Sequence, residues 1–286
     1  MSCIYIVILY LGVLWNGPDP IKGSCETVKA LKEMGKRIFY VTNNSSKTRK
    51  EYTVKCNKLG FDATEDEIVC TSYIAALYLH NIGFKGKIYV VGNEGMGEEL
   101  DNYGFNHCGI GPDPVKGPTD LHSFSTTELD PDVNCVLVGF DPHLSYNKMV
   151  KGASYARREG ALFIATNEDS FLPLDGDVVI PGTGSIVSAV KVPARKEPIV
   201  MGKPEVNMFK ALQQAYNLDP QRSMMVGDRC NTDIMMAHNC GMKSLLVMSG
   251  CTTQEELEKY KSDRDSYGTY IPTYVANRLG ELLECL

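Results

Sequence analysis

Three short segments place polar side chains directly after a predicted strand, where they could bind a phosphate group and a metal ion. Thr42-Asn43-Asn44 offers a hydroxyl and two amides ahead of a predicted helix, whose free N–H groups attract anions. Lys203, in a Gly-Lys-Pro string, can set an ammonium beside a phosphate. Asp228 and Asp233 follow an apolar strand at a spacing suited to Mg²⁺. Together the segments predict a phosphate site with a divalent cation.

Each segment also has a plainer interpretation. Thr42-Asn43-Asn44 could be a turn that caps the next helix, and Lys203 could be a solvated loop lysine. Asp228 and Asp233 could be an N-cap and a surface acid. All three segments follow a predicted strand, which is where open parallel sheets bind their ligands, but taken singly each segment keeps both interpretations.

The elements that must position these side chains form two similar regions at the ends of the chain. In both regions apolar, β-rich runs alternate with helical patterns, which predicts a parallel sheet covered by helices. The expected strands are 4–11, 37–42, 198–201, 223–226 and 243–248, and the expected helices are 24–34, 47–59, 231–240 and one beginning near Pro204.

The middle of the chain has a different sequence pattern, with fewer helical segments between its predicted strands. Strands are expected at 87–91, 135–138 and 162–165, separated by turn-dense segments and by a Gly/Pro-rich run at 109–118. The sequence therefore predicts an α/β protein with a doubly wound, mostly parallel sheet core and a large inserted α/β cap domain. The expected bounds are 1–84 and 198–286 for the core and 85–197 for the cap.

Composition excludes several classes of protein. The chain has 286 residues, enough for about two domains, and its net charge of −6 with 43% apolar residues argues against a nucleic-acid partner. Its ten cysteines contain no Cys-x-x-Cys pair, which indicates reduced thiols in a cytoplasmic protein. The apolar run at 3–15 is too short to span a membrane, so we expect a buried strand there.

Further strings give the chain a family resemblance. It resembles the haloacid dehalogenase superfamily, in the branch of the 4-nitrophenylphosphatases, phosphoglycolate phosphatases and pyridoxal phosphatases. The resemblance implies Mg²⁺-dependent hydrolysis of small phosphomonoesters through an aspartyl-phosphate. It also implies a cap that closes over the core, selects the leaving group and forms a homodimer. The strings that carry it are Gly12–Gly17, Gly139–His143, Pro181–Ser185, Gly202–Pro204 and Val226–Arg229.

The resemblance also implies roles for the polar segments. Thr42 would hold the transferring phosphoryl group, with Asn43 and Asn44 close by. Lys203 would neutralise the phosphate and the nucleophile. Asp228 would bind Mg²⁺ with support from Asp233. A cap loop at 167–173 is expected to face the substrate, but its residues do not specify the leaving group.

The first motif of the family is altered in this chain. The family has Asp-x-Asp-Gly-Val at the end of the first strand, whereas this chain has Leu9-Tyr10-Leu11-Gly12-Val13. Leu9 and Leu11 thus occupy the positions of the nucleophile and the acid/base, and an alkyl group has neither a lone pair nor a proton to give. Loss of a covalent nucleophile lowers kcat on the order of a millionfold. The sequence therefore predicts an inactive chain with a weakened or absent Mg²⁺ site.

Two explanations of the altered motif stay open. Residues 1–11 could come from an alternative or misassigned first exon, in which case the true product is an active phosphatase. Alternatively, the chain is a pseudophosphatase that binds a phosphorylated metabolite or acts as a regulatory module. A separate hypothesis concerns Cys230, whose thiol could be inert or could be made redox-active by the neighbouring Arg229.

Overall fold

The structure is a computed structural model that describes residues 4–115, 117–172 and 177–286. The chain folds into two compact units. The first unit contains both ends of the chain, and the second contains the middle together with one short segment from the N-terminal region. The first comprises Met1–Thr42, Arg49–Val69 and Lys203–Leu286, and the second comprises Asn43–Thr48 and Cys70–Gly202.

The first unit is organised around a six-stranded sheet with the order β13-β12-β11-β1-β4-β5. Strand β1 lies at its centre and pairs in parallel with β4 and β11, where Leu9 is opposite Val41 and Ile8 is opposite Val226. The inner strands are apolar and largely buried, as expected for a parallel sheet covered on both faces, whereas Tyr274 and Val275 of the edge strand β13 are exposed. Their bounds are Tyr5–Leu9 (β1), Arg37–Thr42 (β4), Ile68–Cys70 (β5), Ser223–Gly227 (β11), Lys243–Val247 (β12) and Tyr274–Ala276 (β13).

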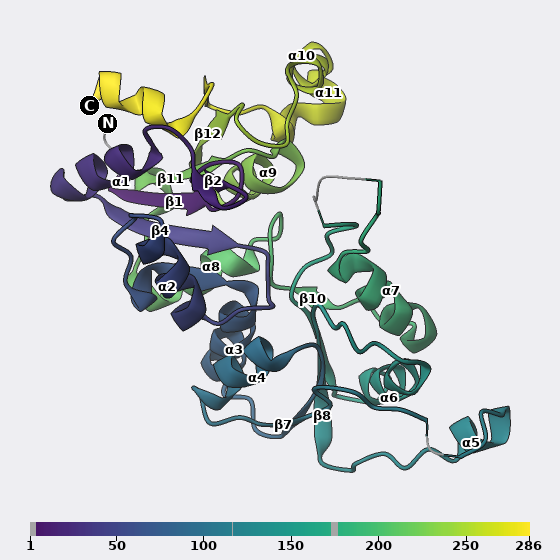
Figure 1. Cartoon of the computed structure of the whole chain (residues 1–286). Coiled ribbons are helices and arrows are strands. Elements are labelled where there is room, and N and C mark those ends of the chain that lie inside the picture. The colour runs from purple at the N-terminus through teal and green to yellow at the C-terminus, as the bar shows by residue number, and fades with distance from the viewer. Residues whose placement is uncertain (1–3, 116, 173–176) are drawn as a thin grey trace. The chain divides into compact units, whose positions relative to one another are not determined.

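Helices and a short hairpin complete the first unit (Figure 1). Helix α1 ends at Glu33, one residue before its predicted end at 34. Gly35, just beyond the helix, has a positive φ of 74°, and glycine adopts this conformation readily at the end of a helix. Ser24, the first residue of this helix, is buried, and its Oγ donates a hydrogen bond to the Leu14 carbonyl at 2.9 Å. The helices are Ser24–Glu33 (α1), Arg49–Lys58 (α2), Asn207–Tyr216 (α8), Met235–Asn239 (α9), Gln254–Ser262 (α10) and Arg264–Tyr267 (α11), and the hairpin is Trp15–Asn16 (β2) with Asp19–Pro20 (β3).

The second unit contains a five-stranded parallel sheet with the order β10-β9-β8-β6-β7. Figure 1 shows α6 and α7 on one face of this sheet and α3 and α4 on the other. The strands are Lys87–Val91 (β6), Asn106–Cys108 (β7), Val133–Val138 (β8), Leu162–Ala165 (β9) and Ile199–Val200 (β10), and the helices are Thr71–Asn81 (α3), Glu94–Asp101 (α4), Leu121–Ser125 (α5), Tyr146–Ala156 (α6) and Thr183–Ala194 (α7).

Strand β10 corrects one prediction. The strand expected at 198–201 was assigned to the core, but β10 pairs with β9 in the second sheet. Strand β10 has only two residues, and both are partly buried. A run this short shows that a strand is present but does not indicate which of two parallel sheets it joins. The bounds of the cap as a functional domain stay a prediction.

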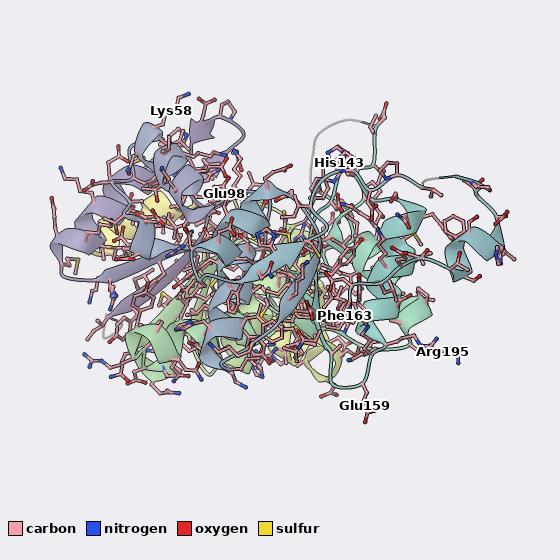
Figure 2. All side chains as sticks on the ribbon, turned by 90° about the horizontal axis from the view of Figure 1, so that it is seen from below. Lys58, Glu98, His143, Glu159, Phe163 and Arg195 are labelled. Carbon is pink, nitrogen blue, oxygen red and sulfur yellow. The ribbon has the colours of Figure 1, made fainter. Side chains whose placement is uncertain are left out.

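The start of α6 is fixed by a buried ion pair. The Lys148 ammonium lies 2.6 Å from Asp141, and neither side chain is exposed to solvent. Buried charges are tolerated when they are paired in this way, so the pair ties α6 to the Gly139–His143 segment. The interior beside it is apolar: in Figure 2 Phe163 lies among packed side chains, whereas Glu159 and Arg195 project outward.

Replacement of the residue that caps α6 is expected to lower stability by about 1 kcal/mol. Ser145 Oγ accepts a hydrogen bond from the Lys148 N–H at 3.2 Å and donates to the Asp113 carbonyl at 3.0 Å, and Ser145→Ala removes both. Urea denaturation measures the loss. The matched control is Ser154→Ala in the same helix, which should change stability by less than about 0.5 kcal/mol. Equal effects of the two changes would contradict the assigned cap.

The described residues bear on two expectations from composition. The nine cysteines among them are all free thiols, as predicted. No helix within 4–115, 117–172 or 177–286 combines the length and the apolar character needed to cross a membrane.

Candidate functional site

Three strand ends of the first sheet bring predicted site residues to one edge. Leu9 ends β1, Thr42 ends β4, and Asp228 directly follows β11. Because β1 lies between β4 and β11 in parallel register, the carboxyl ends of all three strands meet at this edge. Thr42 and Asp228 are both buried. The sheet therefore places a hydroxyl and a carboxylate on either side of the first-motif position.

The two leucines of the first motif, Leu9 and Leu11, have no side-chain oxygen to offer at this edge. Leu9 is half-buried, and Leu11 is 42% exposed. Side chains alternate between faces at this strand end, and Tyr10 is buried in an aromatic cluster, with its ring 4.9 Å from Trp15 and 5.0 Å from Tyr52. The motif thus presents two alkyl groups where the family resemblance implies two carboxylates.

Asp228 is enclosed by backbone. A Cβ atom on either Gly12 or Gly250 would clash with its carboxylate, and Gly12 also has a positive φ of 79°. The Cys251 N–H donates to Asp228 Oδ2 at 2.7 Å. Burial and the nearby Asp233 charge raise the pKa of Asp228, and hydrogen bonds from Cys251 oppose that rise.

Lys203 is held by the second acid of the predicted metal loop. Its Nζ lies 2.7 Å from Asp233 Oδ1, and the two side chains are 3% and 0% exposed. The other oxygen, Asp233 Oδ2, accepts hydrogen bonds from the N–H groups of Asp228 at 3.3 Å and Arg229 at 3.1 Å. Asp233 therefore fixes both the lysine and the loop that carries Asp228.

The residues present do not form a dedicated Mg²⁺ site. Both oxygens of Asp233 are engaged, Leu9 and Leu11 offer none, and Asp228 is the remaining carboxylate of the predicted set. Among the described residues there is no group of three or more His, Cys, Asp or Glu side chains placed to hold a metal ion. Mg²⁺ demands near-octahedral oxygen ligation, so this donor set does not fit it. The assignment of Asp228 and Asp233 as metal ligands stays a prediction from resemblance.

Asn43 and Asn44 belong to the second unit, although they directly follow Thr42. Asn44 Oδ1 accepts hydrogen bonds from both N and Oγ of Ser46 at 2.7 Å, which closes a tight turn. This turn delays α2, which begins at Arg49 rather than at residue 47. The expectation that the N–H groups of this helix contribute to an anion site with Asn43 and Asn44 stays a prediction.

One part of this edge was not predicted from the sequence. The segment after β12 supplies the Cys251 N–H to Asp228, and Ser249 Oγ donates to the Gly12 carbonyl at 2.6 Å. The available signal was a Ser-Gly turn after a predicted strand, the same pattern that marked the other segments.

Cys230 is expected to react slowly with thiol reagents. Its side chain is 1% exposed, and burial raises its pKa to about 11. Arg229 contacts the sulfur of Cys251, at 3.5 Å, so the hypothesis of an arginine-activated Cys230 loses its basis. Alkylation at pH 8, followed by mass spectrometry, should modify Cys230 at least about tenfold more slowly than the exposed Cys285, since the thiolate is the reactive form. Equal rates would contradict this assignment.

Comparison with known proteins shows which proteins the chain is similar to. Residues 8–106 match the family described as haloacid dehalogenase-like hydrolase, and residues 200–282 match one described as HAD-hydrolase-like. Human glycerol-3-phosphate phosphatase is 38% identical over 287 residues, covering 96% of this chain and 88% of that protein. The chloroplastic phosphoglycolate phosphatase 1A of Arabidopsis thaliana is 40% identical over 270 residues, covering 93% and 74%.

The fold agrees with these sequence relationships. The solved structure of a p-nitrophenyl phosphatase from Archaeoglobus fulgidus matches with a TM-score of 0.83 at 29% identity, covering 99% of both chains. The predicted α/β class with mostly parallel sheets is thus confirmed.

Proposed function

The chain belongs to the haloacid dehalogenase-like hydrolases, and from this membership we propose that it binds small phosphate monoesters without hydrolysing them. One observation carries the proposal: Leu9 ends the central strand and Leu11 follows it, and these are the positions to which the family resemblance assigns the nucleophile and the acid/base. Without a lone pair at this point no aspartyl-phosphate can form there.

Phosphate binding is supported by what remains around these leucines. Thr42 retains its hydroxyl at the end of β4, and the Lys203 ammonium is held in place by Asp233. The absence of two carboxylates removes up to two negative charges that would repel a phosphate dianion. A site of this kind does not need a metal ion to bridge phosphate and protein.

The proposed ligands are small monoesters of the glycolate, glycerol or aryl type. The relatives are named for glycerol 3-phosphate, phosphoglycolate and p-nitrophenyl phosphate. All three share a terminal phosphate on a small organic group, which is the part that Thr42 and Lys203 would recognise. The identity of the organic group is a separate question.

Calorimetry tests the proposal. Inorganic phosphate, phosphoglycolate and glycerol 3-phosphate are titrated into the full chain, once with Mg²⁺ and once with a chelator. The expected affinity is micromolar to millimolar, equivalent to roughly 4 to 8 kcal/mol, and unchanged by the chelator. Absence of binding in both conditions, or binding that requires Mg²⁺, would overturn the proposal.

A further inference from the structure

Helices α3 and α4 of the second unit end in the same way. Each is followed by an Asn-x-Gly-Phe string, at residues 81–84 after α3 and at residues 102–105 after α4. The glycine of each string has a positive φ, 65° at Gly83 and 71° at Gly104. The next N–H, of Phe84 or Phe105, donates back to a carbonyl of the preceding helix, which is the Schellman form of helix end. Each phenylalanine therefore lies between a helix end and the next strand, β6 or β7.

These helix ends and strand starts enclose a small cavity. Strands β6 and β7 are neighbours, with Lys87 opposite Asn106, and α3 packs against α4. The cavity has a volume of about 280 Å³, at the small end of the range found for ligand pockets. A Cβ atom on Gly83 or Gly104 would meet no other atom within 4 Å, so the glycines leave space open here. The walls include His80, Phe84, Lys85, Tyr103 and Phe105.

Aromatic rings form a connected group in these walls. The Phe84 and Phe105 rings lie 6.2 Å apart, and the Tyr103 ring lies 6.5 Å from Phe105. The His80 ring lies 5.1 Å from that of Tyr103. The two phenylalanines are only partly buried, so a ligand can reach part of their surface. Aromatic rings attract one another in offset-stacked and edge-to-face arrangements, and the walls therefore suit a ligand that contains an aromatic ring.

The charge at the cavity favours an anionic ligand. Lys85 is exposed and lines the cavity, and among the described lining residues there is no carboxylate. The acid that ends α4, Asp101, is already hydrogen-bonded to His107 at 3.1 Å. The two helix ends add little negative charge, because the Schellman hydrogen bonds occupy carbonyl groups of the last turn. An ammonium ligand would therefore meet the charge of Lys85 without a compensating carboxylate in the cavity wall.

We propose that this cavity binds a small aromatic anion, with its ring against Phe84 and Phe105 and its anionic group beside Lys85. The proposal is independent of the proposed function, because neither Thr42 nor Lys203 lines this cavity. A ligand bound here contacts the ends of α3 and α4 and the starts of β6 and β7 together. It should therefore stabilise the second unit by binding only its folded form.

Three probes with one ring and different charges test the proposal: phenylacetate, 2-phenylethanol and 2-phenylethylammonium. Each is titrated into the isotope-labelled full chain, and the backbone amide NMR signals of Gly83, Phe84, Gly104 and Phe105 report binding. Ligands this small should bind with dissociation constants on the order of millimolar. Phenylacetate should bind about three- to fivefold more tightly than 2-phenylethanol, the factor expected for an exposed ion pair. The ammonium probe should bind more weakly than both.

Two variants of matched charge identify the cation. In Lys85→Gln the affinities for phenylacetate and 2-phenylethanol should agree within about 1.5-fold, because the ion pair is gone. Arg157 is the control: it is exposed at the end of α6, it does not line the cavity, and its loss changes the net charge by the same amount. Arg157→Gln should keep the preference for phenylacetate. Phe105→Leu should weaken all three probes about threefold or more, because a ring contact is lost.

Each alternative has its own result. Tightest binding of the ammonium probe would overturn the assignment of an anion. Equal loss of preference in Lys85→Gln and Arg157→Gln would indicate a net-charge effect and overturn the role of Lys85. Unchanged signals at the four reporter amides, with every probe at tens of millimolar, would show that the cavity is not a binding site. None of the probes carries a phosphate, so these results are separate from the calorimetric test of the proposed function.

Discussion

A chain with both Leu9→Asp and Leu11→Asp is expected to hydrolyse p-nitrophenyl phosphate in the presence of Mg²⁺, and the unmodified chain is not. The double change supplies two carboxylates at the end of β1, between Thr42 on β4 and Asp228 after β11. With Asp228 they give three carboxylates at one edge of the sheet, which is a donor set that suits Mg²⁺. Turnover should rise at least about a thousandfold, since a missing nucleophile costs on the order of a millionfold.

Single changes should rescue little, because nucleophile and acid act as a unit. The isosteric double change Leu9→Asn with Leu11→Asn is the matched control: it adds polarity without a carboxylate, and it should remain inactive. Adding Asp228→Asn to the active double variant should abolish its turnover. Failure of the folded double-aspartate variant to turn over substrate would show that more than the first motif has been lost.

Lys203→Met is expected to lower stability by about 3 to 5 kcal/mol and to abolish phosphate binding. The substitution leaves the buried Asp233 carboxylate without its ammonium partner at 2.7 Å, and an unpaired buried charge is costly. It also removes the positive charge that the proposed function assigns to the phosphate. Urea denaturation measures the first effect, and phosphate calorimetry without denaturant, at a temperature where the variant is folded, measures the second.

A surface pair controls for the loss of charge alone. Lys261 and Glu258 lie 3.2 Å apart with 42% and 60% exposure, so Lys261→Met should cost less than about 0.5 kcal/mol. In the variant that combines Lys203→Met with Asp233→Asn, the loss should be smaller than the sum of the single losses, since the two groups interact. Purely additive losses would contradict the assigned pair.

Most strands of the first unit were predictable because they are apolar runs bounded by residues that favour turns or begin helices. The prediction for β4 matches its bounds, and α1 ends at Glu33, one residue before its predicted end at 34. Strand β5 was missed because three residues show no periodicity, and α3 was missed because eight of its eleven residues are buried, which removes the polar face that identifies a helix. Strand β10 was found, but two residues could not specify its sheet.

The site was predictable to the extent that it consists of strand ends. Leu9, Thr42 and Asp228 meet because parallel strands carry them to one edge. The ion pair of Lys203 with Asp233 and the contact of Asn43 with Asp169 join segments far apart in the chain. Contacts of this kind depend on tertiary packing, which motif spacing alone does not specify.

Release of p-nitrophenol from p-nitrophenyl phosphate by the unmodified chain is the most direct test of the central claim, that Leu9 and Leu11 leave this chain without a nucleophile for phosphate-ester hydrolysis. The assay uses the full chain with Mg²⁺ and an Asp228→Asn variant prepared in parallel. We predict release at the rate of the buffer alone for both proteins. Mg²⁺-dependent turnover by the unmodified chain that disappears in Asp228→Asn would contradict the claim.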